Sequence, residues 1–448
     1  MNIIIIGNGI AGTNAARFIR KYSNHDITMI SGESEFPFSR TALMYVYMGH
    51  MKFNHTKLYE DDFWEKNRIR RIKALVMSIN SKSHSIQLDN GTTMHYDKLI
   101  IASGSKSNTY DWPGKDLKGV QGLYTKQDLE SMEAGSPHIK RAVIVGGGLI
   151  GIEMAEMFYS RNIPVTFLVR ESNFWNHVLP MQESLMINQE ILDHGIDLKL
   201  ETELSEIIDD GKGHVFGVLT SKGERINAQF VGLTVGVSPN IEFLENSIIE
   251  TNRGVLVDDY LESSQRDIYA IGDCVELRSP LPGRKSVEPI WYAGRMMGQT
   301  VAHTICKSPV KYDPGIWFNS AKFFNIEYQV YGNVQPRIAN EFNSLFWQHA
   351  SMNKSIRINY KESDLAVTGF NLLGVRYRHE VCEKWIETKT SIETVLQHLS
   401  LANFDPEFFE QYEHHLLEQY RHYSGNALTL ISKRNLNSVT RFLQKTNS

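Results

Sequence analysis

The chain has 448 residues, of which 42% are hydrophobic and 22% charged, and its formal net charge is -4. This length predicts about three domains, and the composition is that of a globular protein with apolar cores. The slightly acidic balance argues against general nucleic-acid binding, which favours strongly basic chains. The three cysteines stand far apart, so we expect no disulfide framework, no cysteine-bound metal site and a reducing, cytoplasmic setting.

Neither secretion nor membrane insertion is expected. The segment from Met1 to Gly7 lacks the basic start and the longer apolar run of a signal peptide. No apolar run in the sequence approaches the roughly 20 residues that are needed to span a bilayer.

Residues 1–104 predict a strand, a turn and a helix, followed by further strands. An apolar strand at 3–6 runs into Gly7-Asn8-Gly9-Ile10-Ala11-Gly12, and apolar residues at helical spacing follow as far as Ile19. The next expected elements are a strand at 27–30, a hairpin at 73–96 around Asn90-Gly91, and a strand at 99–101 that ends in Ala102-Ser103-Gly104.

Residues 142–236 repeat this order. A strand at 142–145 runs into Gly146-Gly147-Gly148-Leu149-Ile150-Gly151 and a helix, and a strand at 165–169 follows. Hairpin-like strands are expected at about 197–229, and a strand at 230–235 ends in Gly236. The repeat predicts two similar nucleotide-binding folds.

The rest of the chain differs in character. A short segment ends in Tyr269-Ala270-Ile271-Gly272-Asp273, aromatic strands are expected at 317–331 and 365–375, and charge-rich helical patterns follow at 392–423. The tail at 426–445 places apolar residues near helical spacing among basic ones: Leu428, Ile431, Leu436, Val439 and Phe442 with Lys433, Arg434, Arg441 and Lys445. This tail is either a helix packed on the domain or on a partner, or a helix that lies on an anionic membrane.

The two glycine turns have a physical use in binding dinucleotides. Where a strand ends in G-x-G-x-x-G and opens a helix, the first glycine allows the tight turn, the second lets the backbone approach a pyrophosphate, and the third lets helix and strand pack closely. The helix N-terminus adds unpaired N–H groups and the positive end of its dipole. The pattern is met twice, by Gly7, Gly9 and Gly12 and by Gly146, Gly148 and Gly151. One such turn can serve packing alone, but two in matching contexts predict two bound dinucleotides.

An acidic residue near the end of the second strand commonly binds the adenosine ribose hydroxyls. In the first copy the candidate is Glu33, two residues beyond Ser31. A solvated loop carboxylate is the alternative interpretation of Glu33.

Together these motifs resemble the two-dinucleotide-binding-domain flavoproteins, the glutathione-reductase-like superfamily, over about residues 1 to 310. The segment from Tyr96 to Gly104 is similar to the one that ends the first FAD half of that family, and Tyr269 to Asp273 resembles the segment whose aspartate binds the FAD ribityl chain. Phe36-Pro37-Phe38-Ser39-Arg40 resembles one branch, which comprises the NAD(P)H-dependent ferredoxin and rubredoxin reductases, the flavin region of assimilatory nitrite reductases, and apoptosis-inducing factor.

The resemblance implies an α/β fold with two Rossmann-like dinucleotide-binding domains, the NAD domain being inserted in the FAD domain, and a C-terminal α+β interface domain. The implied bounds are 1–112 and 239–309 for the FAD domain, 113–238 for the NAD(P) domain, and 310–448 for the interface domain with its helical tail. Because the interface domain forms the dimer in many relatives, a homodimer is one expectation for this chain.

The resemblance also implies roles for single residues. Arg40 and Thr41 would contact the flavin nucleotide, and Val76 would lie near the adenine. Glu288 to Trp291 would lie near the isoalloxazine ring, and Glu153, the candidate catalytic residue, matches a glutamate at the nicotinamide–flavin junction. The implied FAD site comprises Gly7, Gly9, Ile10, Ala11, Gly12, Glu33, Arg40, Thr41, Val76, Ala102, Ser103, Gly104, Asp273 and Trp291, and the implied NAD(P) site comprises Gly146, Gly148, Leu149, Ile150, Gly151, Arg170 and Gly236.

Two departures from the family bear on the chemistry. Disulfide reductases carry a redox-active cysteine pair, and some relatives a single cysteine, at about the position of Thr41. A hydroxyl cannot relay two electrons as a thiolate does, so we expect electrons to leave from the flavin itself. Several relatives carry a lysine about where Tyr45 stands, positioned to pair with the glutamate that matches Glu153. That pair is absent here, which leaves the role of Glu153 open.

The predicted function is transfer of a hydride from NAD(P)H to FAD, followed by electron transfer to an external acceptor. The second strand of the NAD domain ends in Val169-Arg170-Glu171, whereas NADH-binding relatives usually place an acid at about Val169. A guanidinium suits a 2′-phosphate, so Arg170 slightly favours NADPH. An ion pair between Arg170 and Glu171 is the alternative.

The acceptor is expected to be a small molecule or a small iron–sulfur or rubredoxin-type protein. A basic run could steer an acidic carrier: Lys66, Arg68, Arg70, Arg71 and Lys73. A solvated strand face is the alternative interpretation of that run. The competing function is a flavin-bearing redox-sensing protein, in which the reduction state regulates contact with a partner and turnover is slow.

Overall fold

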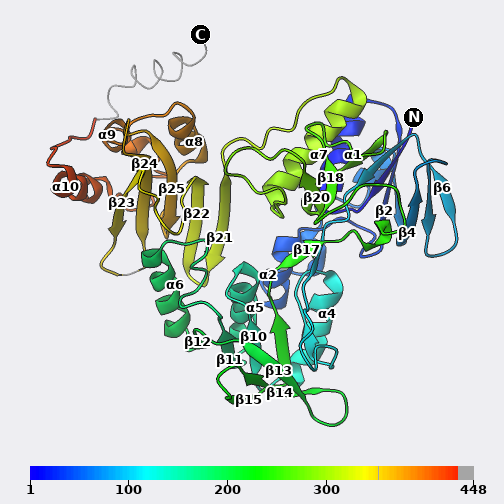
Figure 1. The fold of residues 1–448 in the computed structure, drawn as a ribbon, viewed down its shortest axis with the longest axis horizontal. Helices are drawn as coiled ribbons and strands as arrows, with labels where there is room; N and C mark the ends of the chain where they lie inside the picture. The colour runs from blue at the N-terminus through cyan, green and yellow to red at the C-terminus, as the bar shows by residue number, and fades with distance from the viewer. Residues whose placement is uncertain (352, 432–448) are drawn as a thin grey trace. The chain divides into compact units, whose positions relative to one another are not determined.

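The computed structural model describes residues 1–351 and 353–431, and it divides into two compact units (Figure 1). The first unit comprises residues 1–170 and 202–314, and the second comprises residues 171–201 and the chain from residue 315 onward. The fold is α/β with Rossmann-like parallel sheets, as the sequence predicts. Among the described residues, no helix has the length and apolar character that crossing a membrane requires.

The first parallel sheet of unit 1 has the strand order β19-β7-β1-β2-β3. β1 lies in its centre and pairs with β2 and β7, with Ile3 opposite both Ile27 and Lys98. The continuous isoleucine run of β1 is almost fully buried, because both faces of a parallel sheet are covered. The strands are β1 (Asn2–Ile6), β2 (Asp26–Ser31), β3 (Ile69–Lys73), β7 (Lys98–Ile101) and β19 (Ile268–Ala270).

Two helices and several short elements accompany this β1 sheet. α1 (Ile10–Tyr22) and α7 (Trp291–Cys306) pack closely, since a Cβ atom on Gly298 would lie 2.5 Å from the carbonyl oxygen of Ala11. The predicted hairpin is confirmed as the antiparallel sheet of β4 (Val76–Asn80), β5 (Ser85–Leu88) and β6 (Thr93–His95). The remaining elements are α2 (Leu43–Tyr47), α3 (Phe63–Lys66), β18 (Val255–Val257), β20 (Val275–Leu277) and short 3-10 turns at 40–42, 53–56, 242–244 and 272–274.

The second parallel sheet of unit 1 contains β11, β10, β16 and β9 in that order. Ala142 of β10 lies opposite Val165 of β11 and Phe230 of β16, so this β10 sheet repeats the central arrangement of the β1 sheet. Its strands and helices are β9 (Val120–Gln121), β10 (Ala142–Val145), β11 (Val165–Leu168), β16 (Phe230–Leu233), α4 (Lys126–Gly135), a 3-10 turn at 136–138 and α5 (Leu149–Ser160). The antiparallel sheet that packs on the same core consists of β13 (Leu204–Asp209), β14 (Val215–Thr220) and β15 (Arg225–Asn227).

Two chain segments connect the β1 sheet with the β10 sheet, and they run side by side. β8 (Ser105–Ser107) follows β7, and β17 (Val237–Pro239) follows β16. The two strands pair antiparallel, with Ser105 opposite Pro239. The chain therefore leaves the β1 sheet and returns to it through one paired crossing.

Unit 2 contains an antiparallel sheet with the order β21-β22-β25-β24-β23. The sequence predicts β21, β22 and β25 but misses β23 and β24. The unit also holds α6, whose Glu183 forms a forked, almost fully buried ion pair with Arg357 of β24 (2.6 and 2.8 Å). The bounds are α6 (Met181–Asp193), β12 (Asp197–Lys199), β21 (Phe318–Phe323), β22 (Ile326–Gly332), β23 (Phe342–Gln348), β24 (Ser355–Lys361), β25 (Val367–Leu373), α8 (His379–Glu387), α9 (Ile392–Gln397), a 3-10 turn at 399–401 and α10 (Glu413–Ser424).

The described part of the tail differs from the prediction. α10 ends at Ser424 because Gly425 takes a left-handed φ of +78°. Residues 426–431 form no helix, and Leu428 and Leu430 pack against the core of unit 2. The remaining tail residues of the prediction, from Lys433 to Lys445, lie outside the described residues.

Candidate functional site

The first glycine turn leaves space only at its middle glycine. Gly7 has a φ of +109°, and a Cβ atom there would overlap the carbonyl oxygen of Ala102 at the end of β7. A Cβ atom on Gly12 would overlap the carbonyl oxygen of Gly7, whereas one on Gly9 would meet no atom within 4 Å. Packing therefore requires the first and third glycines, while the backbone at Gly9 faces open space that a phosphate can fill.

The N-terminus of α1 lies at this open space. Ile10 and Ala11 begin the helix, and Gly9 precedes them without a side chain to cap the first N–H groups. Those groups have no partner within the helix, and the helix dipole makes this end positive. Asn8 is engaged elsewhere, since its side-chain amide donates to the carbonyl of Ser34 at 2.8 Å. An arrangement of this kind, called a cradle below, is able to hold a diphosphate.

The second turn repeats this geometry. Gly146 has a φ of +113°, and a Cβ atom there would lie 2.6 Å from the carbonyl oxygen of Thr234. A Cβ atom on Gly151 would overlap the carbonyl oxygen of Gly146, and one on Gly148 would meet no atom within 4 Å. Leu149 begins α5 without a capping side chain. The β10 sheet thus carries a second cradle of the same kind.

Further contacts fix the second turn. The Thr234 hydroxyl donates to the carbonyl oxygens of Val145 (2.8 Å) and Gly146 (3.1 Å), which ties the turn to the end of β16. Leu149 and Ile150 follow as the first two residues of α5, so their backbone N–H groups belong to the uncapped end of the helix.

The closing glycines of the two sheets occupy equivalent places. Gly104 follows Ala102 and Ser103 and has a φ of +71°, and Gly236 has a φ of +95°. Each directly precedes one strand of the β8–β17 pair. The Ser103 hydroxyl donates to the carbonyl of Asn240 at 2.8 Å, which holds the two crossing segments together. The left-handed conformation at both glycines turns the chain out of each sheet.

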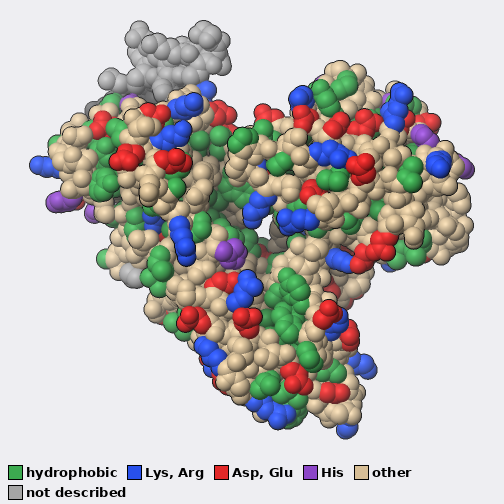
Figure 2. All heavy atoms as spheres, viewed as in Figure 1, with side chains coloured by type: hydrophobic (Ala, Val, Ile, Leu, Met, Phe, Trp, Pro, Cys, Tyr) green, Lys and Arg blue, Asp and Glu red, His purple; other side chains and the backbone are tan. Residues whose placement is uncertain are grey.

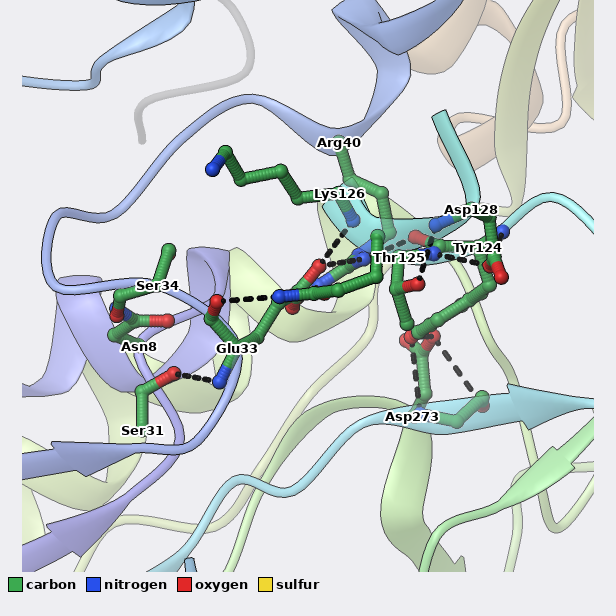
Figure 3. A network of polar contacts seen from close by, with 12 residues as sticks. Asn8, Ser31, Glu33, Ser34, Arg40, Tyr124, Thr125, Lys126, Asp128 and Asp273 are labelled. Carbon is green, nitrogen blue, oxygen red and sulfur yellow. Dashed lines mark hydrogen bonds and ion pairs between the residues drawn. The ribbon is translucent and has the colours of Figure 1, made fainter. Parts of the chain in front are cut away.

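Glu33 and Arg40 form a forked ion pair (Figure 3). The two guanidinium nitrogens donate to the two carboxylate oxygens at 3.0 and 2.6 Å, and the backbone N–H of Lys126 donates to Glu33 Oε1 at 2.8 Å. The guanidinium also donates to the carbonyl of Tyr124 and lies 4.3 Å from the centre of its ring. Burial opposes the charge of Arg40, but the hydrogen bond to Glu33 and the charge of Glu33 raise the pKa of Arg40 above its usual value.

Tyr124 connects this ion pair with Asp273. Its hydroxyl donates to Asp273 Oδ2 at 3.2 Å and accepts the backbone N–H of Ser105 at 2.9 Å. Burial raises the pKa of Asp273, and burial together with the charge of Asp273 raises the pKa of Tyr124, which therefore stays protonated and donates. Sequence reasoning missed Tyr124, because a single tyrosine before a helix cap carries no binding signal.

Thr41 and Tyr45 make local contacts. Thr41 is exposed in the 3-10 turn before α2, and its hydroxyl lies 3.1 Å from that of Ser39. The Tyr45 ring stacks with the His50 ring at a centroid distance of 6.0 Å. These side chains supply no thiol and no ammonium group at this place.

The three cysteines are free thiols. Cys274 directly follows Asp273, is fully buried, and donates to the carbonyl of Ile271 at 3.3 Å. Burial raises the pKa of the Cys274 thiol, so this sulfur is protonated and inert at neutral pH.

Glu153 lies in the first turns of α5, just beyond the second cradle. Part of its surface is accessible, yet the surrounding protein displaces enough water to raise the pKa of Glu153 to about 7, and the charge of Glu156 adds to this shift. A carboxyl with this pKa changes its charge near neutral pH. The group is therefore able to hold or release a proton under ordinary conditions.

Trp291 begins α7 beside the first cradle. One turn later, a Cβ atom on Gly294 would lie 3.6 Å from both Gly272 Cα and Ile10 Cγ2. The start of α7 therefore lies against the start of α1 and the turn that carries Asp273.

Val76 is the half-buried first residue of β4, and no described contact joins it to the Arg40 network.

Val169 and Arg170 follow β11 and differ in burial. Val169 is buried against the second turn, where a Cβ atom on Gly147 would lie 2.8 Å from Val169 Cγ1. Arg170 is exposed. Val169 thus packs against the turn, and the arginine next to it is exposed.

The basic run is partly neutralised by its neighbours. Lys66 pairs with Asp62 at 2.5 Å, and Arg71 pairs with Glu35 at 3.7 Å while its guanidinium lies 3.9 Å from the centre of the Phe36 ring. Among the described residues, Figure 2 shows acidic and basic side chains interspersed on the face in view. Charges on the edge strand β3 also protect a sheet edge from pairing with another chain.

Comparison with protein-family models shows the family to which the chain belongs. A family model described as pyridine nucleotide-disulphide oxidoreductase matches residues 1–303. The chain belongs to this family. The match covers both glycine turns and ends within α7.

Relatives within the family include electron-transfer proteins. The NADH-rubredoxin oxidoreductase of Clostridium acetobutylicum is 26% identical over 402 residues, which cover 89% of this chain and 99% of that protein. The assimilatory nitrate reductase electron transfer subunit of Bacillus subtilis is 26% identical over 308 residues, which cover 68% of this chain. The match spans only 39% of that subunit, and only 37% of the nitrite reductase of the same organism. The resemblance to rubredoxin and nitrite reductases is confirmed.

A solved structure shows the same fold. It is an engineered water-forming NADPH oxidase, made from the NADH oxidase of Lactobacillus brevis and bound to NADPH. It matches with a TM-score of 0.80 and 18% identity, over 94% of this chain and 99% of that one.

Proposed function

We propose that this protein is an FAD-dependent NAD(P)H oxidoreductase that passes electrons to an external acceptor. The observation that carries the proposal is the pair of matching cradles in unit 1. In each, the outer glycines are fixed by packing and the middle glycine faces open space at an uncapped helix N-terminus. Two such cradles suit two dinucleotides.

The first cradle is the proposed FAD site. The N–H groups of α1 would hold the diphosphate, Arg40 would lie along it, and Asp273 would accept hydrogen bonds from the ribityl chain. Glu33 would bind the adenosine ribose or, through its forked bond, orient Arg40. The start of α7 at Trp291 would lie near the ring system. When bound there, FAD supplies the chemistry of accepting a hydride and giving up electrons.

The second cradle is the proposed NAD(P)H site. The N–H groups of Leu149 and Ile150 would hold the diphosphate. Glu153, one turn along α5, would lie beside the nicotinamide and change its charge near pH 7. A carboxylate there favours the oxidised nicotinamide, which carries a positive charge, over the neutral reduced form.

Electrons are proposed to leave without a cysteine relay. Thr41 offers only a hydroxyl, and Cys274 is buried with a raised thiol pKa. Neither group forms a thiolate that could take electrons at neutral pH.

Arg170 supports a preference for NADPH. In the engineered NADPH oxidase, an aspartate is replaced by alanine and the residue after it by arginine. The same sequence of types, an apolar residue followed by an arginine, stands here at Val169 and Arg170, and the arginine is exposed. A guanidinium pairs well with a 2′-phosphate.

The proposed acceptor is a small iron–sulfur or rubredoxin-type protein. The Clostridium relative is an NADH-rubredoxin oxidoreductase, and the match covers 99% of its length.

A second candidate function is that of a flavin-bearing redox sensor. Thr41 and Tyr45 favour it, because they supply neither a thiolate nor an ammonium group that could take part in turnover.

The proposal is tested with the FAD-loaded protein under anaerobic conditions. In a stopped-flow experiment, addition of NADPH or NADH should bleach the visible flavin absorbance within seconds or faster. Subsequent addition of rubredoxin or ferredoxin should restore the absorbance rapidly. Fast reduction with only slow reoxidation by rubredoxin, ferredoxin, quinone and oxygen would favour the redox sensor. A flavin that stays yellow with both nucleotides would contradict the proposed function.

A further inference from the structure

Tyr47, the last residue of α2, contacts α5 and the ends of α4 and α5. It is almost fully buried, with 1% of its surface exposed. Its hydroxyl lies 2.5 Å from the hydroxyl of Ser136, which itself donates to the carbonyl of Met132 at 2.6 Å. The Tyr47 hydroxyl is therefore the donor in its bond to Ser136. This bond ties the end of α2 to the end of α4.

Arg161 holds the same residue from the other side. It is the residue after α5, and its Nε and Nη2 both donate to the backbone carbonyl of Tyr47, at 3.0 and 2.5 Å. Its guanidinium carbon lies 3.6 Å from the centre of the Tyr47 ring. Phe158 of α5 completes the contact, edge-on to Tyr47 at 5.8 Å. The carbonyl of Tyr47 ends α2, where helix carbonyls have no intrahelical partner, so Arg161 acts as its cap.

Tyr47, Ser136 and Arg161 form a contact that we call the clamp. The three helices that meet there, α2, α4 and α5, are each connected to one of the two cradles or to a residue beside it. α2 follows directly on Arg40 and Thr41 of the first site. α5 begins at the second cradle and carries Glu153. α4 begins at Lys126, whose N–H donates to Glu33. The clamp is thus the point at which the supports of both sites are joined to one another.

We propose that Tyr47 and Arg161 are positioning residues that set the alignment of the bound nicotinamide against the bound flavin. The inference rests on the proposed function of the two cradles. α5 has 12 residues, so the clamp lies about 18 Å from the second cradle along the helix axis. A rocking of about 3° at the clamped end moves the other end by about 1 Å. A misplacement of about 1 Å can cost about a hundredfold in rate.

The test uses Arg161→Met, which keeps the unbranched aliphatic part of the side chain and removes both bonds to the Tyr47 carbonyl, together with the 3.5 Å ion pair to Glu133. Arg161→Lys retains one charged donor and is the conservative variant. Arg141→Met is the matched control, because Arg141, directly before β10, is also a half-buried arginine but donates to Thr166 of β11. Tyr47→Phe is a second, independent variant that keeps the ring and removes only the bond to Ser136.

In Arg161→Met, we expect the rate constant of anaerobic flavin reduction to fall about ten- to a hundredfold. FAD content and the dissociation constant of NAD(P)H should stay within about twofold of the wild type. The long-wavelength charge-transfer absorbance of the nucleotide complex should weaken, with Arg161→Lys intermediate. Hydrogen exchange in residues 43–47 and 131–138 should speed up in Arg161→Met and Tyr47→Phe but not in Arg141→Met.

Three results would overturn the inference. They are a wild-type reduction rate in both clamp variants, an equal loss in Arg141→Met, and unchanged hydrogen exchange at residues 43–47. If neither NADH nor NADPH reduced the flavin of the wild-type protein, the proposed function would be refuted instead. The hydrogen-exchange comparison would then still show whether the clamp restrains α2.

Discussion

The charge of Glu153 is expected to change near neutral pH. Its carboxyl has a pKa of about 7 in the folded protein, against 4.5 for an exposed glutamate, chiefly because of burial. The folded state therefore binds this proton more tightly than the unfolded chain does. Ionisation costs folding free energy, so the contribution of Glu153 to stability is lost as pH rises through the window from about 4.5 to about 7.

We expect Glu153→Gln to remove this part of the pH dependence. Thermal unfolding midpoints of the wild type should fall relative to those of the variant between about pH 5 and about pH 8. The ratio of NAD(P)+ to NAD(P)H affinity should rise over the same range in the wild type and stay flat in the variant. Parallel melting curves at every pH would show that Glu153 titrates at its ordinary pKa.

Arg170 allows a second test at the same scale. If its guanidinium binds the 2′-phosphate, Arg170→Ala should cost roughly 1.5–3 kcal/mol of NADPH binding, on the order of ten- to a hundredfold in affinity. NADH binding should change much less. Titration calorimetry with both nucleotides measures the difference, and Arg225→Ala, at another exposed arginine of unit 1, is the control. Equal losses for NADPH and NADH would leave the ion pair with Glu171 as the better interpretation.

The backbone conformation of the two glycine turns follows from neighbouring residues in the chain. Gly7 and Gly146 could be predicted, because a turn between strand and helix requires a positive φ there. The forked bond between Glu33 and Arg40 could not, although both residues were singled out, because the sequence does not show which way a loop side chain points. Tyr124 was missed because it reaches Arg40 only through a contact 84 residues away.

At the scale of elements, α1 and α7 define the geometry of the first cradle. Gly298 brings the two helices so close that an added Cβ atom would lie 2.5 Å from the carbonyl of Ala11 and 3.0 Å from the N–H nitrogen of Ala15. Gly294, one turn earlier in α7, would make only ordinary contacts of 3.5 Å or more. Packing of α7 against α1 therefore requires glycine at position 298 but not at position 294.

Gly298→Ala should therefore lower the free energy of unfolding by about 1–3 kcal/mol, because the helices must separate. It should also weaken FAD binding, since α1 carries the cradle. Gly294→Ala is the matched control and should change stability by less than about 1 kcal/mol, because alanine favours the helix and meets no clash. Denaturant unfolding of both variants, together with FAD content, gives the comparison. Equal stabilities would show that the α1–α7 contact is not tight.

β1 and β10 were predicted from their uninterrupted apolar patterns. β24 was missed although its polar residues, Ser355, Arg357 and Asn359, alternate with apolar ones as in a strand; those polar residues are also buried, which such alternation does not indicate. Its arginine is accommodated by Glu183, which lies 174 residues away and leaves no local signal. The helical pattern of the tail likewise failed at residues 426–431, where Leu428 and Leu430 contact the core without forming a helix.

At the scale of the whole molecule, unit 1 contains two copies of the same strand–turn–helix arrangement. Each copy has a buried parallel strand, a turn whose first and third glycines are fixed by packing, and an uncapped helix end at the middle, open glycine. The central claim is that the first copy holds FAD and the second holds NAD(P)H. The packing-fixed glycines serve the fold, so only the open glycines separate binding from stability.

The most direct test compares Gly9→Ala with Gly148→Ala. Both glycines have a negative φ that alanine adopts, and both face open space, so the protein without nucleotides should change in stability by less than about 1 kcal/mol. We predict that Gly9→Ala loses at least about tenfold in FAD affinity. Gly148→Ala should retain a full complement of FAD and lose a similar factor in NAD(P)H affinity. Undiminished binding of both ligands in both variants, or loss of the same ligand from both, would contradict the account.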